Sequence, residues 1–141
     1  MLDQVKKLAA VFLTAVALAA LAGCSSAAGS LDGTAWRLTG WTLSSLYPGD
    51  FTITASFAGG QISGRSGVNS YGGTYRAGAG GSFEVGELAS TLMAGPEPDM
   101  RAEAAYLELL GAAGSYKLDG STLTLYDRNG SESLIFTAGG G

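Results

Sequence analysis

The stretch FTITASFAGGQISG, residues 51–64, gives the clearest indication of the fold. Its first eight residues alternate between an apolar face and a face of mainly hydroxyl side chains. The apolar face carries Phe51, Ile53, Ala55 and Phe57. Such alternation predicts a β-strand with one buried face. Gly59-Gly60 follows directly and predicts a tight hairpin turn, because glycine reaches positive φ without steric cost.

Short strands are also predicted on both sides of this hairpin. Residues 31–41, LDGTAWRLTGW, supply four large core anchors, which are Leu31, Trp36, Leu38 and Trp41. SFEVGEL at residues 82–88 and STLM at residues 90–93 predict two more strands. Near the C-terminus, Asp119-Gly120 and Asn129-Gly130 each separate two alternating runs. Both dipeptides favour type I′ turns, which suit antiparallel hairpins.

The apolar period changes to that of a helix within residues 96–114. The predicted inner stripe is Met100, Ala104, Leu107 and Gly111, with Leu110 beside it. Pro98 suits the first helical position, and Asp99 is favourable near the positive end of the helix dipole. With about eight short strands and one helix, the chain is expected to be mainly β. A small antiparallel, barrel-like sheet packed with one helix is the architecture that accommodates these elements.

The N-terminus carries the pattern of an export signal. Lys6 and Lys7 precede an apolar run of 13 residues, which is short for a bilayer span and suits a signal peptide. LAGC, residues 21–24, follows and resembles a bacterial lipobox. We therefore expect a signal peptide over residues 1–23, lipidation of Cys24, and a flexible tether over residues 24–30. The alternative is an ordinary secretory signal with an incidental cysteine.

Composition excludes several classes of function. Cleavage before Cys24 removes Lys6, Lys7 and Asp3, which leaves 6 basic and 11 acidic side chains. This acidic body predicts no nucleic-acid partner and no polybasic membrane patch. The 141 residues include no histidine and one cysteine, so an internal disulfide, a Cys/His zinc site and a Ser-His-Asp triad are excluded. No cofactor is expected.

Three segments carry a resemblance to a known family. GTAWRL, ITASFAGGQISGRSGVNSYGGTY and VGELASTLMAGPEPDM occur in the order typical of META domains, a family that includes HslJ-like heat-shock proteins. The resemblance covers about residues 31–137 and leaves a Gly-rich tail, residues 138–141. It implies a small barrel-like β domain with one helix. Many members are exported or lipid-anchored, and the family is linked to heat shock and antibiotic tolerance without an established biochemical activity.

The resemblance also singles out two positions. Many META domains have cysteine where this chain has Val68 and where it has Gly95. Because both cysteines are absent together, the resemblance implies that the two positions are neighbours in space.

Candidate functional residues gather in RSGVNSYGGTY, residues 65–75. One hypothesis is a ligand or partner surface formed by Arg65, Asn69, Tyr71 and the nearby Arg76. The alternative is a structural corner, in which Asn69 turns the chain and Gly72-Gly73 form a bulge or a second turn. The sequence leaves open whether Tyr71 and Tyr75 share a face.

Other chemistry receives weaker support. A carboxylate pair for acid–base catalysis would come from Glu84, Glu87, Glu97, Asp99 and Glu103. Calcium ligands would come from Asp119, Asp127 and Asn129, although turn chemistry also accounts for these residues. The Gly-rich run at residues 78–81 precedes a strand and does not match a nucleotide-binding loop.

The sequence therefore predicts a cell-envelope lipoprotein whose domain is a non-enzymatic binding or stress-protective module. Its expected partners are the membrane, through the lipid on Cys24, and an envelope protein or small ligand. An envelope enzyme that uses a carboxylate pair and a structural envelope protein are the alternatives. Ser25 replaces the aspartate that often retains lipoproteins in the inner membrane, so the outer membrane is expected where two membranes exist.

Overall fold

The computed structural model describes residues 30–42 and 45–139. The predicted signal peptide, Cys24, most of the tether and the last two residues of the tail lie outside the described residues. Among the helices of the described part, none has the length and apolar character needed to cross a bilayer.

Nine strands, one α-helix and one short 3-10 helix make up the described chain. In chain order they are β1 Thr34–Trp41, η1 Pro48–Asp50, β2 Thr54–Ala58, β3 Gln61–Arg65, β4 Ser70–Ala77, β5 Phe83–Val85, β6 Ala89–Ser90, α1 Glu97–Gly111, β7 Ala113–Asp119, β8 Thr122–Asp127 and β9 Glu132–Ala138. All strand pairs are antiparallel, in the order β5-β4-β3-β2-β1-β9-β8-β7, and β6 pairs with β4 beyond β5.

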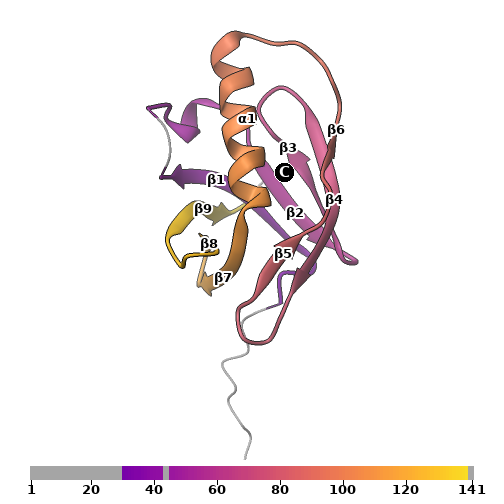
Figure 1. Ribbon diagram of the computed structural model, residues 1–141, viewed down its shortest axis with the longest axis vertical. Coiled ribbons are helices and arrows are strands. Elements are labelled where there is room, and N and C mark those ends of the chain that lie inside the picture. The colour runs from indigo at the N-terminus through magenta and orange to yellow at the C-terminus, as the bar shows by residue number, and fades with distance from the viewer. Residues whose placement is uncertain (1–29, 43–44, 140–141) are drawn as a thin grey trace, which may run out of the picture.

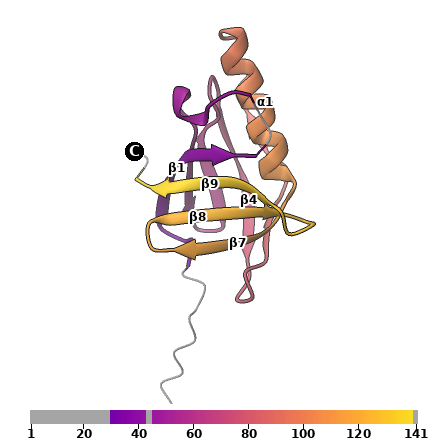
Figure 2. The same cartoon turned by 90° about the vertical axis from the view of Figure 1, so that its left-hand side faces the viewer.

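The two ends of this sheet approach each other and nearly close a barrel (Figure 1). An isolated bridge pairs Ser82 with Ser115. Beside it, the Tyr116 N–H donates to the carbonyl oxygen of Gly81 at 2.8 Å. These contacts join the start of β5 to β7, while α1 lies along one side of the barrel (Figure 2). The predicted mainly β, barrel-like fold with one packed helix is confirmed.

The barrel interior is filled by the residues that the alternation placed inward. Phe51, Ile53, Ala55 and Phe57 are all buried, although β2 itself begins only at Thr54. Leu31, Trp36 and Leu38 are also buried, and Trp41 packs against the core from the edge. The remaining large core side chains include Ile62, Tyr71, Phe83, Tyr106, Leu110, Tyr116, Leu123, Leu125, Leu134 and Phe136.

The first predicted turn is confirmed, and the other two differ in detail. Gly59-Gly60 joins β2 to β3 with φ of 59° and 77°, as a type I′ turn requires. The β7–β8 turn consists of Gly120-Ser121, one residue later than predicted, since Asp119 still pairs with Thr122. The predicted type I′ turn at Asn129-Gly130 is wrong, because four residues, 128–131, separate β8 from β9.

Asp127 organises that longer loop. Its N–H donates to the carbonyl oxygen of Ser131, and the Gly130 N–H returns to the Asp127 carbonyl oxygen. Its side-chain Oδ1 accepts from the Asn129 N–H at 2.8 Å and from the Ser131 N–H at 3.0 Å. Gly130 has a φ of 83°, which is the left-handed conformation that such hairpin loops need near their end. These contacts occupy Asp127 in turn formation.

The helix forms over nearly the predicted range, and Leu110 is buried as predicted, but the predicted stripe beside it is wrong. Pro98 stands at the second helical position, after Pro96 at the N-cap. The buried residues are Ala102, Glu103, Tyr106, Leu109 and Leu110. Of the predicted stripe, Met100, Ala104 and Gly111 are exposed and Leu107 is half-buried. The apolar pattern gave the wrong phase because a carboxylate occupies the inner face.

The predicted strand at residues 90–93 is also shorter than expected. β6 contains only Ala89 and Ser90. Thr91 still donates its N–H to Ser70, but Leu92 and Met93 lie largely exposed beyond it. A local apolar run therefore predicted a strand where the chain leaves the sheet to reach α1.

Candidate functional site

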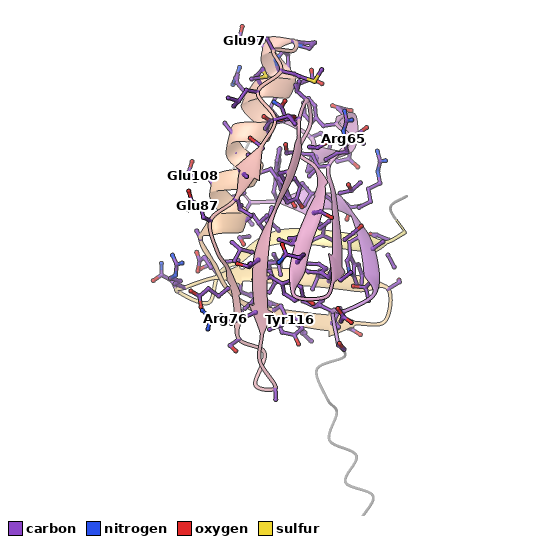
Figure 3. The ribbon with its side chains drawn as sticks, turned by 90° about the vertical axis from the view of Figure 1, so that its right-hand side faces the viewer. Arg65, Arg76, Glu87, Glu97, Glu108 and Tyr116 are labelled. Atoms are coloured by element: carbon purple, nitrogen blue, oxygen red, sulfur yellow. The ribbon has the colours of Figure 1, made fainter. Side chains whose placement is uncertain are left out.

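The structure separates the four residues of the predicted ligand surface. Asn69 and Tyr71 are buried, at 2% and 4% relative exposure, whereas Arg65 and Arg76 are exposed. Arg65 pairs with Ser70, six residues before Arg76 on β4, which corresponds to about 20 Å along a strand. Figure 3 shows Arg65 near the end that carries Glu97, and Arg76 near the opposite end beside Tyr116. The four residues therefore do not line one surface.

Asn69 is a structural hub that has no free polar atom in its side chain. Its Nδ2 donates to Glu103 Oε1 at 2.8 Å and to the Met93 carbonyl oxygen at 3.1 Å. Its Oδ1 accepts from the Met93 N–H at 2.7 Å and from the Thr91 hydroxyl at 2.8 Å. An asparagine side chain has two N–H donors and two acceptor lone pairs, and all four are used here. The corner interpretation therefore accounts for Asn69.

Glu103 is the second member of this hub and enters from the inner face of α1. Its Oε2 accepts from the Ser66 hydroxyl at 2.9 Å, the Val68 N–H at 3.2 Å and the Asn69 N–H at 2.8 Å. With the Asn69 amide on Oε1, the carboxylate accepts four hydrogen bonds. Burial raises the pKa of Glu103, but these hydrogen bonds stabilise the charged form more strongly, so its pKa lies below the ordinary value. We call Ser66, Val68, Asn69 and Glu103 the carboxylate staple, because they join α1 to the β3–β4 turn.

The carboxylate staple predicts an acid-sensitive contribution to stability. The pKa of Glu103 is lower in the folded chain than its ordinary value of 4.5, which the unfolded chain restores. Its stabilising effect is therefore complete above that value and is lost as the pH falls through the folded pKa. We expect the urea midpoint of the wild type to decrease between about pH 5 and pH 3 more steeply than that of Glu103→Gln. Glu108→Gln is the exposed control on the same helix. An equally steep decrease of the urea midpoint with pH in the wild type and in Glu103→Gln would contradict this assignment.

Tyr71 forms a second buried polar contact. Its hydroxyl donates to the Thr54 carbonyl oxygen at 2.8 Å and accepts from the Tyr106 hydroxyl at 2.6 Å. Burial raises the pKa of both phenols. Tyr71 and Tyr75 share the inward face, since β3 and β4 pair in continuous register through Gly72-Gly73 and no bulge forms there. Tyr75 packs edge-on against Phe57, with ring centroids 4.8 Å apart.

An open groove of about 960 Å³ lies where the β4–β5 hairpin meets β7 and the first described residues, Ser30 and Leu31. Six of its 15 lining residues are glycine or alanine, so backbone rather than large side chains forms much of its wall. The larger lining side chains include Tyr75, Arg76, Phe83, Glu84, Tyr116 and Arg128. Of the four residues predicted to form a ligand surface, only Arg76 lines this groove, which we call the tether-end groove; the candidate carboxylate Glu84 lines it as well.

Comparison with known proteins places the fold in a family. The META domain family profile matches residues 29–139. The chain belongs to the META domain family. No protein of curated function matches it.

Three solved structures resemble this META domain. A protein from Burkholderia xenovorans, solved by NMR, is 28% identical with a TM-score of 0.68, over 81% of this chain and 87% of that one. A second NMR structure is 21% identical with a TM-score of 0.54, over 76% of this chain and 90% of its own. A crystal structure of a DUF4847 family protein from Bacteroides vulgatus is 13% identical with a TM-score of 0.56, over 76% and 93%. The last two show similarity of fold alone.

The META domain also brings Val68 and Gly95 together, as the resemblance implied. A Cβ atom placed on Gly95 would lie 3.4 Å from the Val68 Cβ and 2.6 Å from its Cγ2. Gly95 does not have a positive φ, so a side chain there meets no backbone strain. The implied proximity is confirmed.

The described residues do not bring together the predicted calcium ligands or the predicted carboxylate pair. Within residues 30–42 and 45–139, no cluster of three or more His, Cys, Asp or Glu side chains is arranged to hold a metal ion. Asp127 is engaged by its own loop, and Glu103 by the carboxylate staple. Glu84 is the single carboxylate among the described residues that line the tether-end groove.

Proposed function

We propose that the chain is a lipid-anchored cell-envelope protein whose META domain is a non-enzymatic binding module. The observation that carries this proposal is the position of the tether-end groove. Ser30 and Leu31 line it, and Ser30 is six residues from Cys24. Six residues span at most about 20 Å. A lipid on Cys24 would therefore keep the groove within that distance of the membrane surface.

Binding is favoured over catalysis by the composition of the groove. A carboxylate-pair hydrolase needs two carboxyl groups that flank the substrate. Glu84 is alone in the described lining of the tether-end groove, and Glu103 is saturated by hydrogen bonds elsewhere. The groove instead presents two guanidinium groups and aromatic side chains, which are binding chemistry. A stress-protective role would follow from ligand binding close to the membrane.

The anchor itself is tested by processing of the natural protein. We expect the protein from its native membrane to lack residues 1–23 and to carry a lipid on Cys24, because a basic start, a short apolar run and LAGC precede that residue. Intact mass spectrometry measures both changes. In a two-membrane organism, the outer-membrane fraction is the expected location.

Two variants sharpen this test. Cys24→Ser should remain unlipidated, whereas Ser25→Ala should be processed like the wild type. An unmodified Cys24 or a retained leader in the wild type would refute the anchor while leaving the groove proposal open.

A further inference from the structure

The lining of the tether-end groove includes two arginines, although the protein is acidic. Arg76 and Arg128 line it, out of the six basic side chains that follow Cys24. They come from different elements, since Arg76 lies on β4 and Arg128 in the β8–β9 loop. Their convergence on one groove is a product of the fold, because 51 residues separate them in sequence.

The two guanidinium groups keep most of their donors free. Throughout the described part of the chain, neither arginine has a carboxylate within ion-pair distance, and the ion pair found there joins Arg101 to Glu97. Arg128 makes one long hydrogen bond, of 3.4 Å, from Nη2 to the Gly111 carbonyl oxygen. Glu84 stands opposite Arg76 in the β4–β5 register without pairing to it. Guanidinium groups with free donors are suited to carboxylate and phosphate.

Apolar residues also line the groove. Leu31, Phe83 and Tyr116 belong to the barrel core and are part of this lining. Tyr75 is half-buried above Phe57 and faces the same space. Gly114 leaves room for Arg128 in the lining, because a Cβ on Gly114 would lie 3.1 Å from Arg128 Cγ. A ligand that filled the groove would therefore meet both guanidinium groups and aromatic carbon.

We propose that the tether-end groove binds a small amphipathic anion. Arg76 and Arg128 bind its phosphate or carboxylate head, and its apolar body lies against Tyr75 and Phe83. This inference deepens the proposed binding function and rests on it. Two sources share this chemistry: a phospholipid of the membrane, and a soluble alkyl phosphate or fatty acid.

Isothermal titration of the full chain in a neutral maltoside detergent tests the proposal. Hexyl phosphate should bind at least about tenfold more tightly than inorganic phosphate, since burial of each methylene contributes to affinity. Arg76→Gln and Arg128→Gln should each weaken hexyl phosphate about tenfold, because loss of one charge-assisted contact has an effect of that order. Arg37→Gln removes the same charge from an exposed site on β1 and should change the affinity less than about twofold.

A second variant separates loss of the groove from loss of charge. Ala77→Phe places a ring in the groove opposite Phe83 on the neighbouring strand and keeps both arginines, so it should also abolish binding. Thermal melts establish that each variant is folded. Equal weakening by Arg37→Gln and Arg76→Gln, or unchanged binding in Ala77→Phe, would overturn the proposal.

The source of the ligand is decided by a further arm. Dihexanoyl phosphatidylglycerol binding more tightly than hexyl phosphate identifies a phospholipid, and the reverse order identifies a soluble anion. Absence of binding by both compounds rejects the amphipathic anion. Because the titration does not depend on the state of Cys24, this failure is distinct from failure of the anchor.

Discussion

Glu103→Ala is expected to lower the free energy of unfolding by about 3–5 kcal/mol. The substitution removes the acceptor of four hydrogen bonds. The Ser66 hydroxyl can still donate to the Asn69 carbonyl oxygen at 3.0 Å, so the donors that lose their acceptor are two backbone N–H groups and one N–H of the Asn69 amide. Each buried donor left unpaired has a desolvation penalty of about 1–3 kcal/mol, and local rearrangement or water entry recovers part of it. Urea denaturation monitored by tryptophan fluorescence measures the change.

The control for this prediction is Glu108→Ala, five residues further along α1. Glu108 is exposed, so its removal should change stability by no more than about 0.5 kcal/mol. Asn69→Ala should approach the effect of Glu103→Ala, and the double variant should fall well short of the sum, because both residues belong to one network. A loss below about 1 kcal/mol for Glu103→Ala would show that the carboxylate staple contributes little to stability.

The double variant Val68→Cys with Gly95→Cys is expected to form a disulfide and to stabilise the domain by about 3 kcal/mol. The two Cβ positions are 3.4 Å apart, just below the separation of about 3.5–4.5 Å that is usual in a disulfide. The bond would close a loop of 26 intervening residues and restrict the unfolded chain. The melting temperature under oxidising conditions should rise by roughly 10 °C or more.

The single variants should behave differently. Gly95→Cys alone places its Cβ 2.6 Å from a Val68 methyl carbon, so overpacking should destabilise the domain by about 1–3 kcal/mol. Val68→Cys alone should have a smaller effect. Intact mass under non-reducing conditions should show the loss of two hydrogen atoms in the double variant, and reductant should reverse its stabilisation. A folded double variant that keeps both thiols free under oxidant would refute the pairing.

The strands were predictable because one-sided burial imposes a period of two. The alternation from Phe51 to Phe57 alone predicted which side chains are buried. Gly59-Gly60 alone predicted the turn that follows. The change of apolar period predicted the helix, but it did not predict which face of the helix is buried. A charged residue faces inward at Glu103, and only the β3–β4 turn 34 residues earlier explains why.

The site was less accessible to prediction because its parts are distant in sequence. Asn69 gave a turn signal, yet its partners Met93 and Glu103 lie 24 and 34 residues away. The tether-end groove joins Arg76 to Arg128 across strands that no local pattern pairs. Much of that groove exists because side chains are small or absent, and scattered glycines and alanines have no distinctive spacing. Val68 and Gly95 were found only through the family resemblance.

The pairing of β1 with β9 has a consequence for how the domain is made. Trp36 pairs with Ala138, so the first and last strands meet in the middle of the sheet after about 100 intervening residues. Closing so large a loop is slow in comparison with forming the local hairpins β2–β3 and β7–β8. Both hairpins precede β9 in chain order, so they are synthesised before the strand that unites them. The barrel core is therefore completed only once β9 has been synthesised, and a chain shortened before β9 lacks the strand that joins β1 to β8.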